Sequence, residues 1–351
     1  MSNDEKYMNR CLQLAKMGAG MVAPNPMVGA VLVYENKIIS EGYHQKFGEA
    51  HAEVNCINNT DEKDKSLIEK STLYVSLEPC AHHGKTPPCT NLIIKKKIKK
   101  VVVGCQDSYK EVDGKGIQKL RSAGIEVVTG ILETECKELN KRFFTFHQKQ
   151  RPFVILKWAQ SADGKIGSAG NERILISNDY SNCLVHKWRS EEAAVLVGTN
   201  TVLKDNPSLT TRFWEGKNPL RIIIDKKLKV PSTWNIFNDA AKTIVFNSMK
   251  DSLQSNIQFI KIKTKDLLKE MLYSIYENNI QSILVEGGAK MLQSLIDADL
   301  WDEARVITNE KMIIGNGINA PKMKNFSSTN WENYFGDIIH YYKKTDKEQE
   351  K

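Results

Sequence analysis

Two segments decide how the first half of this chain folds: His51-Ala52-Glu53 and Pro79-Cys80-Ala81-His82-His83-Gly84-Lys85-Thr86-Pro87-Pro88-Cys89. Together they supply one imidazole, two thiolates and a carboxylate. A catalytic zinc ion typically takes three protein ligands and keeps a further position open for water. The pattern therefore predicts a zinc site with His51, Cys80 and Cys89 as ligands.

The same residues have the chemistry for hydrolytic deamination. Zinc lowers the pKa of a bound water from about 15.7 to roughly 7. Glu53 follows His51 by two residues, at the expected start of a helix, where it can take a proton from that water and deliver protons to the ring nitrogen and the departing amine. The order His-x-Glu, then Pro-Cys-x-x-Cys, is the signature of zinc nucleobase deaminases. We therefore predict Glu53 as a catalytic residue.

The cysteine spacing is longer than in that signature, because the whole segment 81–88 separates Cys80 from Cys89. We expect Cys80 to follow a strand over 72–77 and Cys89 to open the next helix, which leaves the loop free to contact a substrate. Other interpretations stay open. His82 or His83 could replace one ligand, the zinc could be purely structural, or the cysteines could simply be buried.

Hydrophobic periodicity predicts a layered α/β first half. An amphipathic helix over 4–17 precedes strands at 28–34 and 38–42, which are joined by the turn Glu35-Asn36-Lys37. Helices and strands then alternate: a helix from 50, a strand over 72–77, a helix from 89, a strand over 101–105, a helix over 115–122 and a strand over 125–128. An antiparallel pair that continues into βα units resembles the cytidine-deaminase fold, with zinc at two helix N-termini.

Length and composition indicate two ordinary domains. The chain has 351 residues, and a polar, basic stretch over 146–152 is the expected joint, so we place domains at 1–147 and 152–351. Hydrophobic and charged contents of 41% and 26% are typical of globular proteins. No apolar run is long enough for a membrane helix and no signal-peptide pattern opens the chain, so we expect a cytoplasmic protein with reduced cysteines and no membrane partner.

The net charge of +8 has two interpretations. The lysines at 95–97 and 99–100 could be a nucleic-acid footprint, or they could be a solvated helix end whose charges complement the helix dipole. The aromatic content is 8% and no stacking array lies near these lysines, so we favour the helix end and expect no nucleic-acid partner.

Further segments resemble the bifunctional deaminase-reductase family of riboflavin biosynthesis: Pro24-Asn25-Pro26-Met27-Val28-Gly29, Gly42-Tyr43-His44 and Glu78-Pro79-Cys80. The long cysteine spacing is that family's own variant. The resemblance implies zinc-dependent deamination of 2,5-diamino-6-(5-phosphoribosylamino)pyrimidin-4-one, followed by NADPH-dependent reduction of its ribosyl group to a ribityl chain. It also implies substrate contacts by Asn25, His44, His82, Lys85 and Asp107.

One stretch departs from this family. Where its members have an Asp-Pro-Asn-Pro run, this chain has Asp107-Ser108-Tyr109-Lys110. The asparagine contact that the resemblance implies is therefore missing at Tyr109.

The second half carries three more segments that resemble the family, in chain order. The apolar run 153–159 leads into Ser161-Ala162-Asp163-Gly164, the segment 198–212 follows a G-x-x-T-x-x-x-D-x-P-x-L pattern, and Val285-Glu286-Gly287-Gly288 resembles a late strand-to-helix turn. The fold class that we predict is α/β: a cytidine-deaminase-like three-layer domain followed by a dihydrofolate-reductase-like α/β domain.

The turn after Val285 also has a physical interpretation. Glycines let the backbone approach a ligand, and free N–H groups at a helix start suit a phosphate or pyrophosphate, although an ordinary tight turn would look the same. No early G-x-G-x-x-G follows a strand, so a Rossmann site is not indicated.

The resemblance also implies the residue roles in the reductase half. Lys157, or a water, is the candidate proton source, and Lys157 is predicted to be catalytic. The substrate's phosphate and sugar would lie near Arg189, Leu209, Arg212 and Glu286. NADPH would contact Gln160, Thr201, Asp205, Gly288, Ala289 and Lys290. The family's serine and tryptophan contacts are replaced by Arg173 and Leu175, where no site is assigned.

Three functions therefore compete. The first is the bifunctional enzyme, which would act on a small phosphorylated pyrimidine and which we expect to be a homo-oligomer. The second is a cytidine or nucleic-acid deaminase with a C-terminal recognition domain. The third is a zinc-stabilised binding protein without catalysis. Glu53 argues against the third, because a structural zinc has no use for it. Lys85 and the ordered second-half segments favour the first.

Overall fold

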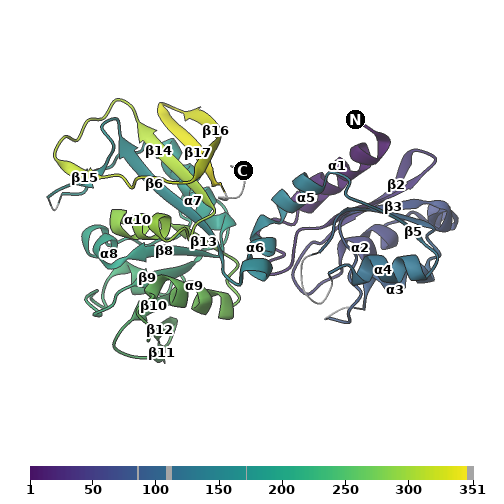
Figure 1. The fold of residues 1–351 in the computed structure, drawn as a ribbon, viewed down its shortest axis with the longest axis horizontal. Coiled ribbons are helices and arrows are strands. Elements are labelled where there is room, and N and C mark those ends of the chain that lie inside the picture. Colours follow the sequence, from purple (N-terminus) through teal and green to yellow (C-terminus); the bar gives the residue numbers. More distant parts are fainter. Residues whose placement is uncertain (85–86, 108–112, 171, 346–351) are drawn as a thin grey trace. The chain divides into compact units, whose positions relative to one another are not determined.

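The computed structural model describes residues 1–84, 87–107, 113–170 and 172–345. The chain divides into two compact units, Met1–Gln150 and Arg151–Lys351. The first part of the joint expected over 146–152 lies inside a helix, because α6 (Lys141–Lys149) ends only at Lys149. Figure 1 shows the helices and strands of both units.

The first unit is built on a five-stranded sheet. Its strands are β1 (Gly29–Tyr34), β2 (Lys37–Tyr43), β3 (Thr72–Leu77), β4 (Lys100–Cys105) and β5 (Glu126–Thr129), in the order β2-β1-β3-β4-β5. β1 pairs antiparallel with β2 and β3, whereas β3, β4 and β5 are parallel. The β1–β2 turn has positive φ values of 45° at Glu35 and 61° at Asn36, the backbone that suits a tight hairpin.

Helices cover both faces of this sheet. On one face lie α1 (Asn3–Lys16), α5 (Glu133–Leu139) and α6; on the other lie α2 (Ala52–Asn58), the 3₁₀ segment η1 (Glu62–Lys70), α3 (Cys89–Lys95) and α4 (Lys115–Ser122). Alternate residues of β1 enter the two cores: Val31 and Val33 pack under α1, and Ala30 and Leu32 under α2. The predicted three-layer arrangement is confirmed.

The second unit contains a ten-stranded sheet in the order β11-β12-β10-β9-β8-β13-β6-β14-β17-β16. The parallel strands are β6 (Phe153–Ser161), β8 (Ala194–Gly198), β9 (Leu220–Ile224), β10 (Thr243–Asn247), β12 (Ile257–Lys261), β13 (Ser282–Val285) and β14 (Glu303–Asn309). Antiparallel strands β11 (Ser252–Gln254), β16 (Phe326–Tyr334) and β17 (Asp337–Lys344) extend the edges, and β7 (Lys165–Ser168) pairs with β15 (Gly317–Asn319).

The helices of this unit divide between the two faces of the sheet. α7 (Asp179–Glu191), α8 (Thr199–Asp205) and η2 (Asn235–Phe237) pack on one face, and α9 (Leu267–Glu277) and α10 (Ala289–Asp297) on the other. The neighbouring strands β8 and β13 are therefore followed by helices on opposite faces. In open α/β sheets, ligands bind outside the carboxyl ends of strands at such a switch point.

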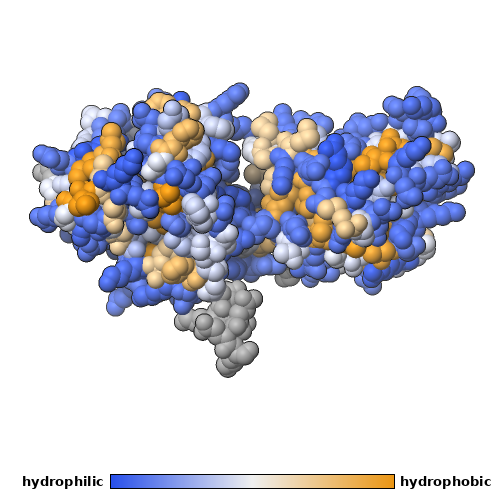
Figure 2. Space-filling view, turned by 90° about the horizontal axis from the view of Figure 1, so that it is seen from above, coloured by the Kyte–Doolittle hydropathy of each residue, from blue (hydrophilic) through white to orange (hydrophobic). Residues whose placement is uncertain are grey.

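Hydrophilic residues dominate the face of the molecule seen in Figure 2, with apolar side chains gathered in small patches. None of the helices in the described ranges has both the length and the apolar character needed to span a bilayer.

Two candidate catalytic sites

The predicted metal ligands come together at one point of the first unit. His51 immediately precedes α2, Cys80 follows β3, and Cys89 is the first residue of α3. The His51 Nδ1 atom lies 3.6 Å from Cys80 Sγ and 3.4 Å from Cys89 Sγ, and the ligand atoms all lie within 4.8 Å of one another. This converging nitrogen and sulfur donor set fits zinc.

Local hydrogen bonds hold Cys80 in place as an anion. The Cys89 backbone N–H donates to Cys80 Sγ over 3.3 Å, and both the N–H and the hydroxyl of Thr90 donate to the Cys80 carbonyl. The Cys89 thiol, and then His51, lower the pKa of Cys80 to about 4 against the effect of burial. Its thiolate in turn, together with burial, raises the pKa of the Cys89 thiol.

Glu53 is the second residue of α2 and is only 3% exposed. Burial raises the pKa of its carboxyl from the ordinary 4.5 to about 7, while the neighbouring His51 acts in the opposite direction. A general acid–base works best when its pKa lies near the working pH. The carboxyl is therefore suited to accept and release protons beside the metal ligands.

Asn25 and His44 form a linked pair next to the ligands. His44 Nδ1 lies 3.0 Å from the Ala50 carbonyl, which can only accept, so this nitrogen carries the proton. His44 Nε2 then accepts from the Asn25 side-chain nitrogen over 3.1 Å. The Asn25 amide is thereby oriented with its oxygen as the remaining acceptor. The His44 ring also packs edge-on against His51, with centroids 5.4 Å apart.

The other predicted deaminase contacts lie in the segments that follow Cys80 and β4. His82 lies half-buried in the loop after Cys80, and Asp107 is buried just after β4. Lys85 lies outside the described residues, as does the departure Ser108-Tyr109-Lys110.

Glu78 is a positioning residue to which sequence reasoning assigned no role. Its buried carboxylate accepts four backbone N–H groups, from Asp107, Gly114, Gly116 and Ile117, at 2.8–3.1 Å. These bonds tie the strand end that carries Cys80 to the start of α4. An acidic residue at the end of an otherwise apolar strand was the available signal.

The second candidate site lies at the carboxyl end of β13, which is in register with the middle of β6, where Lys157 is found. Arg189 of α7 donates from Nε and Nη2 to the two carboxylate oxygens of Glu286, each over 2.6 Å. Burial alone would raise the pKa of Glu286. The positive charges of Arg189 and Lys157 outweigh this effect and hold the pKa of Glu286 below its usual value. Burial, helped by Arg189, lowers the pKa of Lys157. The site thus contains a buried ion pair beside an amine that gives up its proton more readily.

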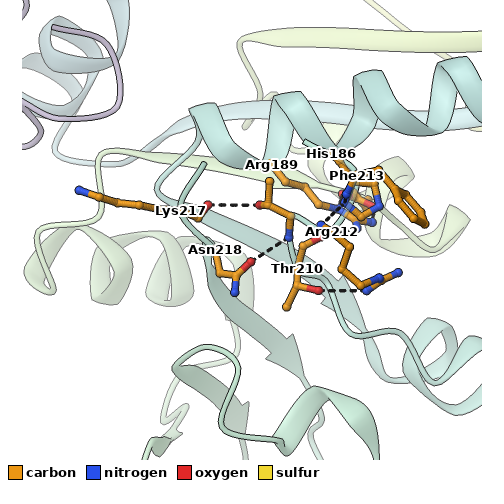
Figure 3. Close-up of polar contacts among 9 residues, drawn as sticks. His186, Arg189, Thr210, Arg212, Phe213, Lys217 and Asn218 are labelled. Atoms are coloured by element: carbon orange, nitrogen blue, oxygen red, sulfur yellow. Dashed lines mark hydrogen bonds and ion pairs between the residues drawn. The ribbon is translucent and has the colours of Figure 1, made fainter. Parts of the chain in front are cut away.

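The two arginines predicted near the phosphate have different partners (Figure 3). Besides Glu286, Arg189 donates to the Thr210 carbonyl over 3.2 Å. Arg212 is exposed and donates from Nη1 to the Thr210 hydroxyl over 3.0 Å. Leu209, the third predicted contact, is buried beneath this segment. Arg212 therefore has the more available guanidinium.

The predicted cofactor residues lie around the β8–β13 switch point. Gly288 caps α10, and a Cβ atom there would come within 3.1 Å of the Thr201 hydroxyl of α8. Gly287 has a φ of +119°, which L side chains rarely adopt, and its carbonyl accepts from Gly198 N–H over 3.1 Å. The turn thus passes close to α8 and leaves the N–H groups of Ala289 and Lys290 at the helix start, which suits a pyrophosphate.

Two other predicted cofactor contacts lie near the end of β6 and at the end of α8. The Gln160 side-chain oxygen accepts from Trp158 Nε1 over 2.8 Å, which fixes its amide. Asp205 ends α8, and burial raises the pKa of its carboxyl despite nearby Arg173 and Lys204.

Together the two sites define a class of protein: a zinc-dependent deaminase domain joined to a nucleotide-dependent reductase domain. Residues 1–105 match the cytidine and deoxycytidylate deaminase zinc-binding region, and residues 152–333 match the RibD C-terminal domain. The chain belongs to the RibD family of riboflavin biosynthesis proteins.

The relatives in this family match almost the whole chain. RibD of Aquifex aeolicus is 43% identical over 322 residues, which cover 90% of this chain and 89% of that protein, and RibD of Escherichia coli K12 is 34% identical with 88% of both chains covered. The crystal structure of the diaminohydroxyphosphoribosylaminopyrimidine deaminase/5-amino-6-(5-phosphoribosylamino)uracil reductase from Thermotoga maritima is 39% identical, with a TM-score of 0.88 and coverage of 97% of this chain and 99% of that one.

These matches confirm the family and the fold predicted from the sequence. The protein is a bifunctional deaminase and reductase of riboflavin biosynthesis. Its deaminase domain is of the zinc-binding type, and its reductase domain is of the RibD type, which uses NADPH.

Proposed function

We propose that the first unit deaminates 2,5-diamino-6-(5-phosphoribosylamino)pyrimidin-4-one and that the second unit then reduces 5-amino-6-(5-phosphoribosylamino)uracil. The observation that carries the proposal is the convergence of His51, Cys80 and Cys89 beside the buried carboxyl of Glu53. The activities in the name of the Thermotoga maritima protein supply the substrate class.

In the deaminase site, His51, Cys80 and Cys89 would hold the zinc. Bound zinc supplies the positive charge that lowers the pKa of water. Glu53 accepts a proton released when water adds to the ring carbon, passes a proton to the ring nitrogen, and helps the amine leave as ammonia. The oriented Asn25 oxygen accepts a hydrogen bond from an amino group of the pyrimidine, with His44 holding the amide in place. His82, Lys85 and Asp107 complete the substrate contacts.

In the reductase site, NADPH would lie against Gln160, Thr201, Asp205, Gly288, Ala289 and Lys290, and hydride transfer is the cofactor's own chemistry. The cluster of Arg189 and Arg212, with Leu209 beneath it, binds the phosphate and sugar. Glu286 is held by Arg189, so its carboxylate is fixed to accept hydrogen bonds from ribose hydroxyls. Lys157 supplies the proton, because its lowered pKa makes proton donation easier.

We further expect the enzyme to work in the cytoplasm as a homo-oligomer, without a nucleic-acid partner. Lys95 ends α3 and Lys96 caps it, where lysines complement the helix dipole, and this supports the interpretation of the basic run as a helix end.

Chelation tests whether the two activities have separate sites. A zinc chelator should abolish ammonia release while leaving NADPH oxidation with already deaminated substrate within about twofold. Readdition of zinc should restore ammonia release. If the chelator abolished both activities, or neither, the assignment of zinc to the deaminase site alone would be wrong.

A further inference from the structure

His186 and Arg189 lie one turn apart on α7 and both hold the segment Thr210–Phe213 (Figure 3). His186 Nδ1 accepts the Arg212 backbone N–H over 2.8 Å, and Arg189 donates to the Thr210 carbonyl over 3.2 Å. α7 itself is anchored to the sheet by buried Val185 and Trp188. The backbone that carries Arg212 is therefore fixed to a rigid helix.

The hydrogen bond defines the protonation state of His186. A backbone N–H only donates, so Nδ1 must be unprotonated and the neutral ring carries its proton on Nε2. His186 is buried, with 4% of the residue exposed. Burial, with the nearby charges of Arg189 and Arg212, lowers the pKa of His186 to about 4. At neutral pH the imidazole is therefore an acceptor that carries no charge.

The charge around Arg212 explains why a neutral acceptor matters. Arg212 is exposed, but partial desolvation and then the like charges of Arg189 and Arg173 lower the pKa of its guanidinium, so this cation sits among like charges. In the part of the chain that the structure describes, Arg212 has no carboxylate partner. Arg189 is already paired with Glu286, and a carboxylate in place of His186 would accept the same N–H but would also neutralise Arg212 and repel an anion.

A second contact fixes the segment from the other side. The Thr211 N–H donates to the Asn218 side-chain oxygen over 2.9 Å, and the Thr211 hydroxyl donates to the Lys217 carbonyl over 3.2 Å. Successive backbone N–H groups at Thr211 and Arg212 therefore each have a neutral acceptor.

We propose that His186 is a positioning residue for the phosphate-binding site of the reductase. Its neutral imidazole accepts the Arg212 backbone N–H and so fixes this backbone. Because the imidazole carries no negative charge, the positive charge of the Arg212 guanidinium stays free for the substrate's phosphate. The inference rests on the proposed function, which assigns the phosphate to Arg189 and Arg212. His186 does not touch the reacting atoms.

Three substitutions separate the acceptor from the charge. His186→Asn keeps a neutral oxygen at the Nδ1 position, His186→Asp keeps the oxygen but adds a negative charge, and His186→Leu removes the acceptor. Each full-length variant is assayed for NADPH oxidation with 5-amino-6-(5-phosphoribosylamino)uracil and with its dephosphorylated analogue. The KM for NADPH and the melting temperature report whether the unit remains folded.

For the phosphorylated substrate, we expect His186→Leu and His186→Asp to raise KM about tenfold with little change in kcat. A tenfold change matches the contribution of a single hydrogen bond such as that from the Arg212 N–H to His186. His186→Asn should stay within about threefold of wild type, and all variants should stay within about twofold for the dephosphorylated analogue. Equal losses with both substrates, loss in His186→Asn as large as in His186→Leu, or wild-type behaviour of His186→Asp would each overturn the proposal.

The wild-type enzyme distinguishes failure of this inference from failure of the proposed function. Wild type should prefer the phosphorylated substrate by at least about tenfold in kcat/KM. If wild type reduced neither substrate, or reduced both equally well, the proposed reductase function or its phosphate site would fail, and the role of His186 would fall with it.

Discussion

Replacing Glu53 with glutamine gives the sharpest test of the deaminase site. Glutamine has nearly the same shape but cannot take a proton. General acid–base catalysis contributes about 10²–10⁴-fold, or about 3–5 kcal/mol of transition-state stabilisation. Because Glu53 handles successive proton transfers, we expect kcat for ammonia release to fall by about 10⁴-fold.

The zinc content of the Glu53→Gln variant should stay at the wild-type level, since the three ligands of the predicted site are His51, Cys80 and Cys89. Metal analysis of the purified protein checks this. Activity within tenfold of wild type would refute the proton-transfer role, and loss of zinc would mean that Glu53 supports the metal site instead.

The same substitution has a stability consequence with a definite sign. A carboxyl whose folded pKa is about 7 instead of 4.5 binds its proton more tightly in the folded state, so zinc-free wild type loses stability as the pH rises from about 4.5 to 7. That pKa difference corresponds to about 3 kcal/mol. The zinc-free variant should therefore be more stable than zinc-free wild type at pH 8, and the gap should close towards pH 4.5. Urea unfolding at both pH values measures the difference, and an equal or less stable variant at pH 8 would contradict the burial argument.

Three further predictions concern the metal ligands and the second unit. Cys89→Ser should lose stoichiometric zinc while the control Cys183→Ser retains it; zinc retained in Cys89→Ser would move the ligand elsewhere. Glu286→Gln leaves Arg189 buried without its charged partner, so the free energy of unfolding of the second unit should fall by about 3 kcal/mol, and an unchanged urea midpoint would refute this. The pKa of His186 is lowered to about 4 in the folded protein, so the unfolded state binds the proton first as the pH falls. The free energy of unfolding should therefore decrease as the pH drops from about 6.5 to 4, and this pH dependence should be weaker in His186→Asn. Identical pH profiles of the two proteins would contradict the lowered pKa of His186.

The sequence was most informative where local patterns determine structure. The strand over Thr72–Leu77 and the helices starting at Cys89 and Lys115 have the predicted bounds, because period-two and helical patterns with glycine and proline at their ends are local signals. The side chains of Cys80 and Cys89 could be assigned together for the same reason, since each stands at the end of a recognisable element.

Contacts between distant residues could not be predicted in this way. Arg189 and Glu286 are separated by 97 positions, and only the packing of α7 over β13 brings them together. The sequence indicated two arginines suited to phosphate, and only the structure shows that Arg189 is largely engaged by Glu286 whereas Arg212 is held by His186. The acidic residue after an apolar strand was visible in the sequence, but the partners of Glu78 were not, because they are backbone N–H groups.

We propose that one chain carries both activities and uses them in order. The most direct test supplies purified, zinc-loaded protein with the phosphoribosylamino diaminopyrimidine and follows ammonia release without NADPH, then NADPH oxidation after its addition. We predict ammonia release in the first phase and NADPH consumption only after deamination has occurred. Ammonia without later NADPH consumption would contradict the reductase assignment, and the absence of both signals would contradict the proposed function of the whole chain.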